Sequence, residues 1–294
     1  MAKILGVGIA TLDIINHVDG YPPEDSEVRA VAQTIRRGGN VANTLAVLAQ
    51  FNHQCYFAGT LSADPDGRRI EKDLRERGID LSAAYWVAQG HAPTSYILLN
   101  RQNGSRSIVH YRDLPEYSLE SFMGLSQSLS EFDWLHFEAR NCDELNGMLA
   151  LARSTVIDQP ISLEVEKERP GLDRLLGYPD LIFFSRPFAR GRGFEEPESF
   201  LRAAREWAPQ AILVVTWGDQ GASLLIGDRF ISEAAHPVSK VLDTIGAGDT
   251  FIAGFIHERV SGRTLEEALV QGCRLAERKI ARDGFDGLVA EPVV

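Results

Sequence analysis

The sequence predicts an α/β fold built on a mainly parallel β-sheet with helices on both faces. From about residue 130 onward, short apolar runs alternate with amphipathic stretches. Apolar runs of this length are typical of buried strands, and amphipathic stretches are typical of the helices that connect them. The expected strands are 134–137, 161–165, 181–184 and 211–216, and the expected helices are 144–153 and 198–207. This alternation indicates βαβ units.

The amino-terminal part of the chain follows the same pattern. Strands are expected at 3–8 and 55–58, and helices at 41–50 and 68–77. Gly78, directly after the second of these helices, is a typical helix stop signal. The same kind of fold is therefore expected from the first residues onward.

Two segments interrupt this pattern. In 14–35, the residues Val28, Ala30 and Ala32 alternate at period two and no helix follows. In the second segment, strand-like runs at 95–101 and 107–111 are joined across Asn103-Gly104, a strong hairpin signal. We therefore predict one domain over 1–294 with a small antiparallel sheet as a lid, formed by excursions at about 12–37 and 92–113.

The composition is that of an ordinary globular protein, and it excludes several kinds of partner. The chain has 294 residues, 44% hydrophobic and 24% charged, so a full-sized core needs no disulfide or metal. Thirty Lys and Arg against 41 Asp and Glu give a net charge of −11. This charge argues against nucleic-acid and membrane partners, which would need a basic face. Apolar runs such as 211–215 are too short to cross a bilayer.

The cysteines and the first residues suggest a cytoplasmic protein. Residues 1–7 are expected to form a strand and lack the long apolar core of a signal peptide. The cysteines Cys55, Cys142 and Cys273 are odd in number and far apart, with no paired spacing. We expect each to be a buried, reduced thiol that behaves as a small hydrophobe.

The sharpest local signal is the segment Asp243-Thr-Ile-Gly-Ala-Gly-Asp249, which precedes an apolar helix over 252–259. Small residues at a helix start let consecutive N–H groups bind an anion. Asp249 would repel a resident phosphate, so it fits better as a base for an incoming hydroxyl, with the N–H cluster stabilising a transferring phosphoryl group. On the segment alone, a helix cap and a tight turn are about equally good explanations.

Two further segments carry candidate binding residues. In Arg37-Gly-Gly-Asn40-Val-Ala-Asn43, the two asparagines are three apart at a helix start, where both amides could grip sugar hydroxyls. Asp13 follows the first strand, at the sheet edge where open α/β sheets bind ligands. Taken alone, the two asparagines are better explained by a helix cap and an exposed polar residue, and a turn residue is the alternative explanation for Asp13. The glycine-rich turn 216–221, after the most apolar strand, could contact nucleotide phosphates or ribose.

Other enzyme classes lack their motifs. Gly6-Val-Gly8 begins like a dinucleotide fingerprint, but Thr11 stands at the third glycine position and no helix follows directly. There is no Walker loop and no Gly-x-Ser-x-Gly nucleophile elbow. The seven histidines show no paired metal-ligand spacing. The sequence therefore does not support a dinucleotide-dependent oxidoreductase, a hydrolase or a metalloenzyme.

These segments, in this order and over essentially the whole chain, resemble the ribokinase (PfkB) carbohydrate kinase family. That family has an early Gly-Gly-Asn motif, here from Gly38 to Asn43, and a late Asp-Thr-x-Gly-Ala-Gly-Asp motif, here from Asp243 to Asp249. The resemblance implies a ribokinase-like three-layer α/β/α domain with a small sheet as a lid, and a kinase that uses ATP with Mg²⁺, with K⁺ as a further activator.

Within the family, the chain is most similar to the ketohexokinase branch, whose members phosphorylate fructose on O1. The segments that carry this likeness are 21–27, 36–40, 136–141, 164–167 and 284–287. The resemblance implies phosphorylation of a ketohexose, D-fructose at O1 being the expected substrate. It also implies a homodimer in which two lids clasp each other. Alternatives are another acceptor, such as ribose, another ketose, a sugar acid or a nucleoside, or a non-catalytic sugar- or nucleotide-binding regulator on the same fold.

The resemblance implies a role for each matching residue. Asp249 would be the catalytic base, with Gly246, Ala247 and Gly248 as the anion hole. The sugar would be held by Asp13, Gly39, Asn40, Asn43, Glu138 and Arg140. The ATP would be bound by Arg106 and by the segment Gly218, Asp219, Gln220 and Gly221.

Three departures from the family pattern bear on these roles. Ser105 replaces the asparagine that precedes the lid arginine in the ketohexokinase branch, so one sugar contact is expected to be shorter or lost. The stretch 185–188 lacks both residues of the Asn-x-x-Glu motif that helps to organise Mg²⁺ in the wider family, which leaves Glu164 and Glu166 as alternative candidates near the metal. The segment 217–220 is closer to the general family than to the ketohexokinase branch.

Overall fold

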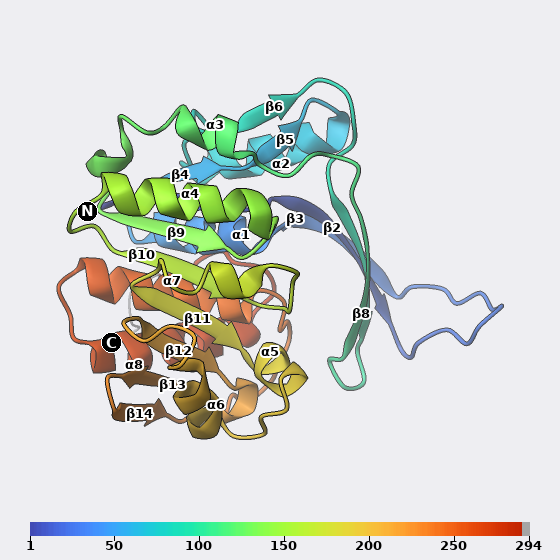
Figure 1. Ribbon diagram of the computed structural model, residues 1–294. Coiled ribbons are helices and arrows are strands. Elements are labelled where there is room, and N and C mark those ends of the chain that lie inside the picture. Colours follow the sequence, from blue (N-terminus) through green and yellow to red (C-terminus); the bar gives the residue numbers. More distant parts are fainter. Residues whose placement is uncertain (290–294) are drawn as a thin grey trace.

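The computed structural model describes residues 1–289, and its largest element is an eight-stranded sheet (Figure 1). Its strand order is β14 (Arg229–Glu233), β13 (Ala222–Ile226), β12 (Ile212–Thr216), β11 (Leu181–Ser185), β10 (Ile161–Val165), β9 (Trp134–Glu138), β1 (Lys3–Val7) and β4 (Gln54–Ala58). The strands from β4 to β12 are parallel, and β13 and β14 are antiparallel to their neighbours. The predicted parallel sheet is confirmed.

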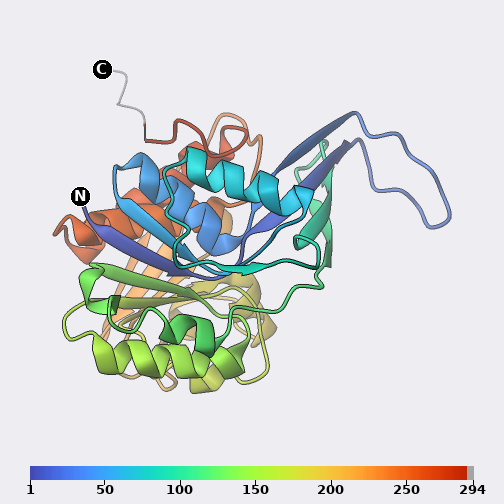
Figure 2. The ribbon, with the colours of Figure 1, turned by 90° about the horizontal axis from the view of Figure 1, so that it is seen from above.

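Helices cover both faces of this sheet, which gives three layers (Figures 1 and 2). One face carries α1 (Asn40–Gln50), α2 (Pro65–Glu76), α7 (Ala247–Val260) and α8 (Leu265–Ile280). The other face carries α3 (Leu119–Met123), α4 (Cys142–Thr155), α5 (Arg186–Gly191) and α6 (Pro197–Ala204). The predicted helices are all present.

Successive residues of the strands pack into separate cores on the two faces, because side chains alternate along a strand. In β12, for example, Leu213 and Val215 join the core under α4 and α6, whereas Val214 joins the core under α7 and α8. All three side chains are fully buried. Burial on both faces explains why these strands are continuous apolar runs in the sequence.

The ends of α2 show how local residues set helix boundaries. The Asp64 side chain accepts a hydrogen bond from the Gly67 N–H at 2.8 Å, and Pro65 occupies the first helical position. These two residues start the helix three residues earlier than its apolar pattern indicated. Gly78, at a φ of 75°, ends it as predicted.

A second, four-stranded sheet stands over the carboxyl ends of the main strands, at the right of Figure 1. We call it the lid sheet, and its order is β3 (Ala32–Gly38), β2 (Thr11–Val18), β7 (Thr94–Asn100) and β8 (Arg106–Tyr111). The two outer pairs are antiparallel, as predicted, but the central pair, β2 with β7, is parallel. Both central strands enter the lid sheet from the main domain and run outward, so they share one direction.

The segment between β2 and β3 differs from the prediction. Val28 and Ala30 lie in an irregular loop that projects from the lid sheet (Figures 1 and 2), and β3 begins only at Ala32. The period-two pattern there has no neighbouring strand to pair with, and a strand needs such a partner. Val28 is accordingly 45% exposed.

The remaining elements are short. They are the two-stranded sheet of β5 (Thr60–Ser62) with β6 (Tyr85–Val87) and the 3₁₀ helices η1 (Leu129–Glu131), η2 (Leu172–Arg174) and η3 (Gly218–Gln220). The three cysteines are free and buried, as predicted. None of the helices within residues 1–289 has the length and apolar character needed to span a membrane.

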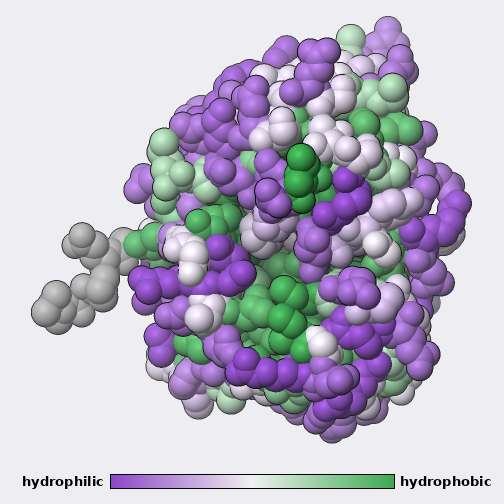
Figure 3. All heavy atoms as spheres, turned by 60° about the vertical axis from the view of Figure 1, so that its left-hand side comes forward, coloured by the Kyte–Doolittle hydropathy of each residue, from purple (hydrophilic) through white to green (hydrophobic). Residues whose placement is uncertain are grey.

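The face that carries the amino ends of the strands lies away from the lid sheet. Figure 3 shows apolar side chains gathered on it among hydrophilic ones. A cavity of about 160 Å³ opens at this end, lined in part by Trp134, Ile157, Phe255 and Leu265. The larger cavity of the protein lies at the opposite end of the sheet.

Candidate active site

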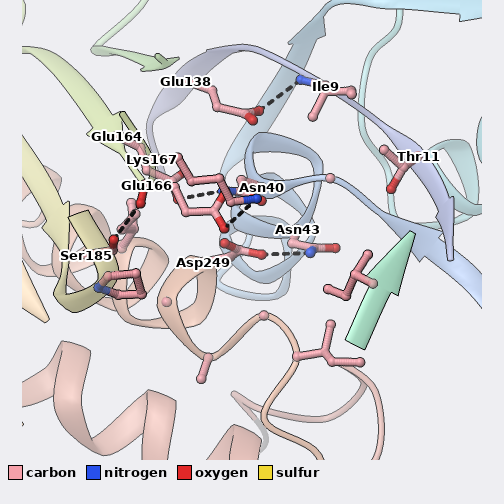
Figure 4. Close-up of a pocket in the computed structure, with 18 of the residues that line it drawn as sticks. Ile9, Thr11, Asn40, Asn43, Glu138, Glu164, Glu166, Lys167, Ser185 and Asp249 are labelled. Carbon is pink, nitrogen blue, oxygen red and sulfur yellow. Dashed lines mark hydrogen bonds and ion pairs between the residues drawn. The ribbon is translucent and has the colours of Figure 1, made fainter. Parts of the chain in front are cut away.

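A cavity of about 440 Å³ lies between the carboxyl ends of the main strands and the lid sheet (Figure 4). Open α/β sheets bind ligands at this edge. Most of the residues singled out in the sequence line it, although they come from distant parts of the chain. They are Asp13, Gly39, Asn40, Asn43, Arg106, Glu138, Arg140, Gly246, Ala247, Gly248 and Asp249.

The start of α7 forms one wall of this cavity. Gly246 precedes the helix at a φ of 80°, and the Phe285 ring occupies the space that a Cβ there would need. A Cβ on Gly248 would meet no atom within 4 Å, so the first turn is open toward the cavity. The N–H groups of a first helical turn have no intrahelical partner and attract anions. This wall can therefore bind a phosphoryl group.

Asp249 lies in that first turn, and its side chain is buried. One oxygen, Oδ2, accepts a hydrogen bond from the Asn43 amide at 2.7 Å. Burial, with a smaller contribution from the charges of Glu166 and Glu138, raises the pKa of Asp249 to about 7 against the lowering effect of the Asn43 hydrogen bond. A carboxylate with such a pKa can accept a proton near neutral pH.

Asn43 makes its second contact on the side away from the cavity. Its Oδ1 accepts a hydrogen bond from the Arg37 guanidinium at 2.7 Å, and Arg37 is itself paired with Asp73 on α2 at 2.5 Å. The two asparagines both line the cavity, but their amides face different protein partners. Arg37 and Asp73 were not singled out as functional residues from the sequence.

Asn40 faces the carboxylates at the end of β10 (Figure 4). Its Nδ2 lies 2.8 Å from Glu164 Oε1 and 3.3 Å from Glu166 Oε2. Both amide hydrogens are thus directed at carboxylates, which leaves the amide oxygen free to accept a hydrogen bond. Asn40 is therefore held in one orientation at the edge of the cavity.

Of the three glutamates on this side, Glu138 and Glu166 each lie within ion-pair distance of a cation, Arg140 and Lys167 respectively. Glu138 accepts a hydrogen bond from the Ile9 N–H at 3.1 Å and lies 3.6 Å from the Arg140 guanidinium. Glu164 is buried, and its Oε2 has no hydrogen-bond partner. Burial raises the pKa of Glu164 well above its usual value, and the nearby charge of Asp249 adds to this. Within residues 1–289, Glu164 therefore has no cationic partner, and its Oε2 has no hydrogen-bond donor.

These carboxylates fit a magnesium ion that is also held by ATP. Mg²⁺ is usually bound by one or two carboxylates together with water and phosphate oxygens, and Glu164 and Glu166 offer two. Within residues 1–289, no three His, Cys, Asp or Glu side chains are grouped as a complete metal site. Ser185 cannot help, because its hydroxyl donates to the Glu166 carbonyl at 2.6 Å and caps α5.

Asp13 lies at the lid end of the cavity. Its Oδ1 accepts a hydrogen bond from the Thr11 hydroxyl at 3.0 Å, and burial raises its pKa. The side chain fills the space that a Cβ on Gly38 would need, and the next glycine, Gly39, has a φ of 97° with the Ile9 carbonyl against it. The paired glycines therefore let the backbone approach Asp13 and the cavity wall closely.

Arg106 connects the lid sheet to the cavity wall that the start of α7 forms. Its Nη1 donates a hydrogen bond to the Thr244 hydroxyl at 3.2 Å. Thr244 lies just before the start of α7. The adjacent Ser105 hydroxyl accepts a hydrogen bond from Tyr21 at 2.9 Å. The guanidinium of Arg106 is thus positioned at the cavity, next to the start of α7.

The segment Gly218 to Gly221 does not line this cavity. It forms η3 directly after β12, whose last residue, Thr216, does line it. Gly218 and Gly221 both have positive φ values, 67° and 91°, and Asp219 pairs with Arg186 at 3.0 Å. The segment therefore forms a turn that begins two residues after Thr216.

A further buried ion pair holds Asp243, the first residue of the late motif. The Lys279 ammonium, fully buried on α8, lies 2.7 Å from Asp243 Oδ2 and 3.1 Å from the Asp243 carbonyl. Arg36 forms an ion pair with the same carboxylate at 2.8 Å. The only sequence signal for these partners was the arginine pair before Gly38, because Lys279 lies in an ordinary amphipathic helix.

Comparison with known proteins assigns this fold and cavity to a family. Residues 1–287 match the family described as "pfkB family carbohydrate kinase". The chain belongs to this family. It is therefore a carbohydrate kinase, a phosphotransferase with an alcohol group as acceptor. Kinases of this family use ATP with Mg²⁺, and their other substrate is a small molecule.

Individual relatives agree with this assignment. Ketohexokinase of Mus musculus is 38% identical over 296 residues, which cover 98% of this chain and 99% of the mouse protein. Ribokinase of Arabidopsis thaliana, solved with ribose and ATP, has a TM-score of 0.77 at 23% identity, over 96% of this chain and 94% of that one. Ribokinase of Giardia lamblia has a TM-score of 0.83 at 16% identity, over 98% and 96% of the two chains. These two structures show that the fold is ribokinase-like.

Proposed function

We propose that this kinase transfers the γ-phosphoryl group of Mg·ATP to a ketohexose, namely to O1 of D-fructose. The similarity to mouse ketohexokinase over nearly the full length of both chains supports this acceptor class. The observation that carries the catalytic part is Asp249, a buried carboxylate with a pKa of about 7 in the first turn of α7. A proton acceptor and an anion-binding helix start thus lie next to each other.

The chemistry follows from this arrangement. Asp249 accepts the proton of the sugar hydroxyl as the hydroxyl oxygen attacks the γ-phosphorus. The bond between the γ-phosphorus and the β–γ bridging oxygen breaks, and ADP leaves with the bridging oxygen. The first-turn N–H groups at Gly246, Ala247 and Gly248 stabilise the charge on the transferring group. The products are the sugar phosphate and ADP.

The sugar is assigned to the lid end of the cavity. The carboxylates of Asp13 and Glu138 accept hydrogen bonds from its hydroxyls, as does the free amide oxygen of Asn40. Gly39 lets the backbone approach the ring, and Asn43 and Arg140 complete the pocket. A region this rich in carboxylates favours a neutral polyol over an anionic sugar.

The nucleotide is assigned to the opposite side. Arg106 is assigned to the phosphates, and the turn of Gly218, Asp219, Gln220 and Gly221 borders the nucleoside. Glu164 and Glu166 would hold the magnesium ion, which would neutralise phosphate charge when bound. A bound cation would also satisfy the partnerless oxygen of Glu164.

Two smaller assignments accompany this function. K⁺ is assigned as an activator, and turnover in K⁺ compared with tetramethylammonium at equal ionic strength tests it. The protein is assigned to the cytoplasm, where its three free thiols would remain reduced. Fractionation of the source cells tests the second assignment.

We also assign a homodimer formed through the lid sheet. Ile35, Ile14, Tyr96 and Val109 lie side by side across its four strands, on the face turned away from the cavity. Ile35, Tyr96 and Val109 are 45%, 50% and 70% exposed. An apolar row of this kind is expected to be covered, and a second copy offers a matching row. Light scattering should give a dimer, and Val109→Lys should give a monomer.

Other acceptors remain the second candidate, because acceptor choice depends on a few pocket contacts. Ser105 is bonded to Tyr21, so it differs from the asparagine of the ketohexokinase branch next to the lid arginine. Ribose, another ketose, a sugar acid and a nucleoside are the alternatives to test. A non-catalytic sugar- or nucleotide-binding regulator is disfavoured, because such a protein gains nothing from a base at Asp249.

The function is tested by ADP release with Mg·ATP across a panel of acceptors. The panel comprises fructose, tagatose, ribose, fructose 6-phosphate, ketodeoxygluconate and adenosine. The highest kcat/KM is expected with fructose, and NMR should identify the product as the 1-phosphate. Higher kcat/KM with another acceptor would overturn the sugar assignment but retain Asp249 as the base. ATP binding without turnover of any acceptor would favour the regulator.

A further inference from the structure

Two consecutive arginines at the end of lid strand β3 reach the two ends of the late motif. Successive side chains of a strand point to opposite faces, so Arg36 and Arg37 diverge. Arg36 pairs with Asp243, the first residue of the motif, at 2.8 Å. Arg37 contacts Asn43, which in turn contacts Asp249, the last residue of the motif. The lid sheet is thus tied to both ends of the catalytic segment.

The second of these connections is a continuous chain of short hydrogen bonds. Asp73 Oδ2 lies 2.5 Å from Arg37 Nε, and Arg37 Nη1 lies 2.7 Å from Asn43 Oδ1. Asn43 Nδ2 lies 2.7 Å from Asp249 Oδ2. Arg37, Asn43 and Asp249 are all at least nine-tenths buried, so water cannot easily replace these bonds. We call these four residues the relay.

The direction of the bonds fixes the Asn43 amide. A guanidinium only donates, so the amide oxygen must face Arg37 and the amide nitrogen must face Asp249. If the amide were turned over, its oxygen would meet the Asp249 carboxylate and its N–H₂ would meet Arg37. Both contacts would be repulsive. Arg37 therefore determines that Asn43 donates to Asp249 Oδ2, which leaves Oδ1 for the substrate hydroxyl.

The relay also brings a positive charge toward the carboxylate. The other charged groups that act on Asp249 are Glu138, Glu164 and Glu166, which disfavour its ionised form. Arg37 favours the ionised form. Asp73, which pairs with both Arg37 and Arg77, offsets part of the Arg37 charge.

We propose that Arg37 is a positioning residue for the base: through Asn43 it orients the Asp249 carboxylate and favours its proton-accepting form. Arg37 itself is not among the residues that line the cavity. The proposal rests on the proposed role of Asp249. It predicts that Arg37 acts on kcat and its pH dependence, and that its effect requires Asn43.

The main experiment measures kcat and the sugar KM of Arg37→Met between pH 5 and 9. The acid limb of the kcat–pH profile is the range in which kcat falls as Asp249 becomes protonated. This limb should move to higher pH by roughly one unit, as expected for loss of a nearby cation. At pH 7, kcat should fall about tenfold or more, with a smaller change in KM. Arg37→Lys keeps the charge but not the forked geometry of the guanidinium. Its acid limb should therefore lie close to that of the wild type, whereas its kcat should be only partly restored.

Two matched variants separate this role from a general loss of structure. Asp73→Asn removes the carboxylate that offsets Arg37, so the acid limb should move downward by a few tenths of a unit, opposite to Arg37→Met. Arg36→Met removes the neighbouring arginine of the same strand, which contacts the other end of the motif. It should change kcat or the ATP KM while leaving the acid limb in place.

The decisive comparison is made in an Asn43→Ala background. If the relay operates, adding Arg37→Met to Asn43→Ala should change the acid limb little further. An unshifted limb in Arg37→Met, or the full shift in the double variant, would overturn the proposal. If Arg37→Met does not fold, an unshifted limb in Asp73→Asn would do so. Full turnover of Asp249→Asn would instead show that the proposed base itself is wrong.

Discussion

The α7 side and the β10 side of the catalytic cavity differ in the partners that hold their carboxylates. On the α7 side, Asp249 is bonded to Asn43, which is bonded to Arg37, and these contacts are short and buried. On the β10 side, Glu164 is equally buried, yet one of its oxygens has no partner. Glu166 on that side accepts a hydrogen bond from Asn40 and forms an ion pair with a largely exposed lysine, Lys167. A chain of side chains that ends at Arg37 holds the Asp249 carboxylate, whereas Glu164 keeps a buried oxygen without a partner.

This difference separates what the protein fixes from what the substrates supply. A base has to be oriented before the acceptor arrives, so its partners come from the protein. Carboxylates without counter-charge are costly when buried, and a cation lowers that cost. Mg·ATP carries such a cation. The α7 side therefore serves proton transfer, whereas the β10 side is assigned to binding the metal.

The largest effect is expected from Asp249→Asn, which removes the base but preserves its shape. Turnover should fall about 10²–10⁴-fold, the range for loss of general base catalysis. ATP affinity should stay the same or rise, because a negative charge near the phosphates is lost. Stopped-flow assays and calorimetric titration with ATP measure the two quantities. Wild-type turnover in this variant would contradict the division between the two sides.

The anion-binding turn is tested by Gly246→Ala. Alanine at a φ of 80° costs about 1–2 kcal/mol, and its Cβ would overlap the Phe285 ring. The melting temperature should fall, and kcat should fall more than about tenfold because the first turn is displaced. Gly78→Ala, at a φ of 75° with open space around it and far from the cavity, is the control. It should lower the melting temperature but leave kcat unchanged.

The metal-binding side is tested by Glu166→Gln. Loss of one carboxylate should weaken binding of Mn²⁺, used in place of Mg²⁺, about tenfold in the presence of ADP. Electron paramagnetic resonance measures free Mn²⁺ directly and needs no turnover. Glu168→Gln, which removes an exposed carboxylate two residues away, is the control. Equal Mn²⁺ affinity of Glu166→Gln and the wild type would rule out this metal site.

A smaller effect is expected on stability from Glu164→Gln. The pKa of Glu164 is raised in the folded protein, so the folded state holds its proton more tightly than the unfolded state. The stability that this proton provides is present below the unfolded pKa, near 4, and is lost as pH rises toward the folded value. Glutamine does not titrate, so Glu164→Gln removes this pH dependence of the stability. Without metal and nucleotide, the variant should melt higher than the wild type, by a margin that grows between pH 5 and 8.

The main sheet could be predicted from the sequence because its strands are buried on both faces. The run 181–184 is continuously apolar, and 161–165 is apolar at Ile161, Leu163 and Val165; they became β11 and β10 almost to the residue. The lid sheet was harder to predict. The period-two pattern at Val28 and Ala30 resembles a strand, but a strand exists only if a neighbour pairs with it.

The candidate site was predicted where its residues lie in short segments and was missed where contacts are long-range. The glycines and Asp249 are recognisable because a helix start needs small residues in a fixed order. Arg37, by contrast, meets Asp73, 36 residues away, and Asn40 meets Glu164, 124 residues away. No local pattern specifies such partners, because only the folded sheet and lid bring them together.

The most direct test of the account is the ionisation of Asp249 itself. We would label the aspartate carboxyl carbons with ¹³C, follow them by NMR from pH 4 to 9, and assign Asp249 from the spectrum of Asp249→Asn. The account predicts a midpoint of about 7, the pKa at which kcat should also fall as the base becomes protonated. A midpoint below 5 would contradict it, since the carboxylate would then be an ordinary exposed or ion-paired aspartate.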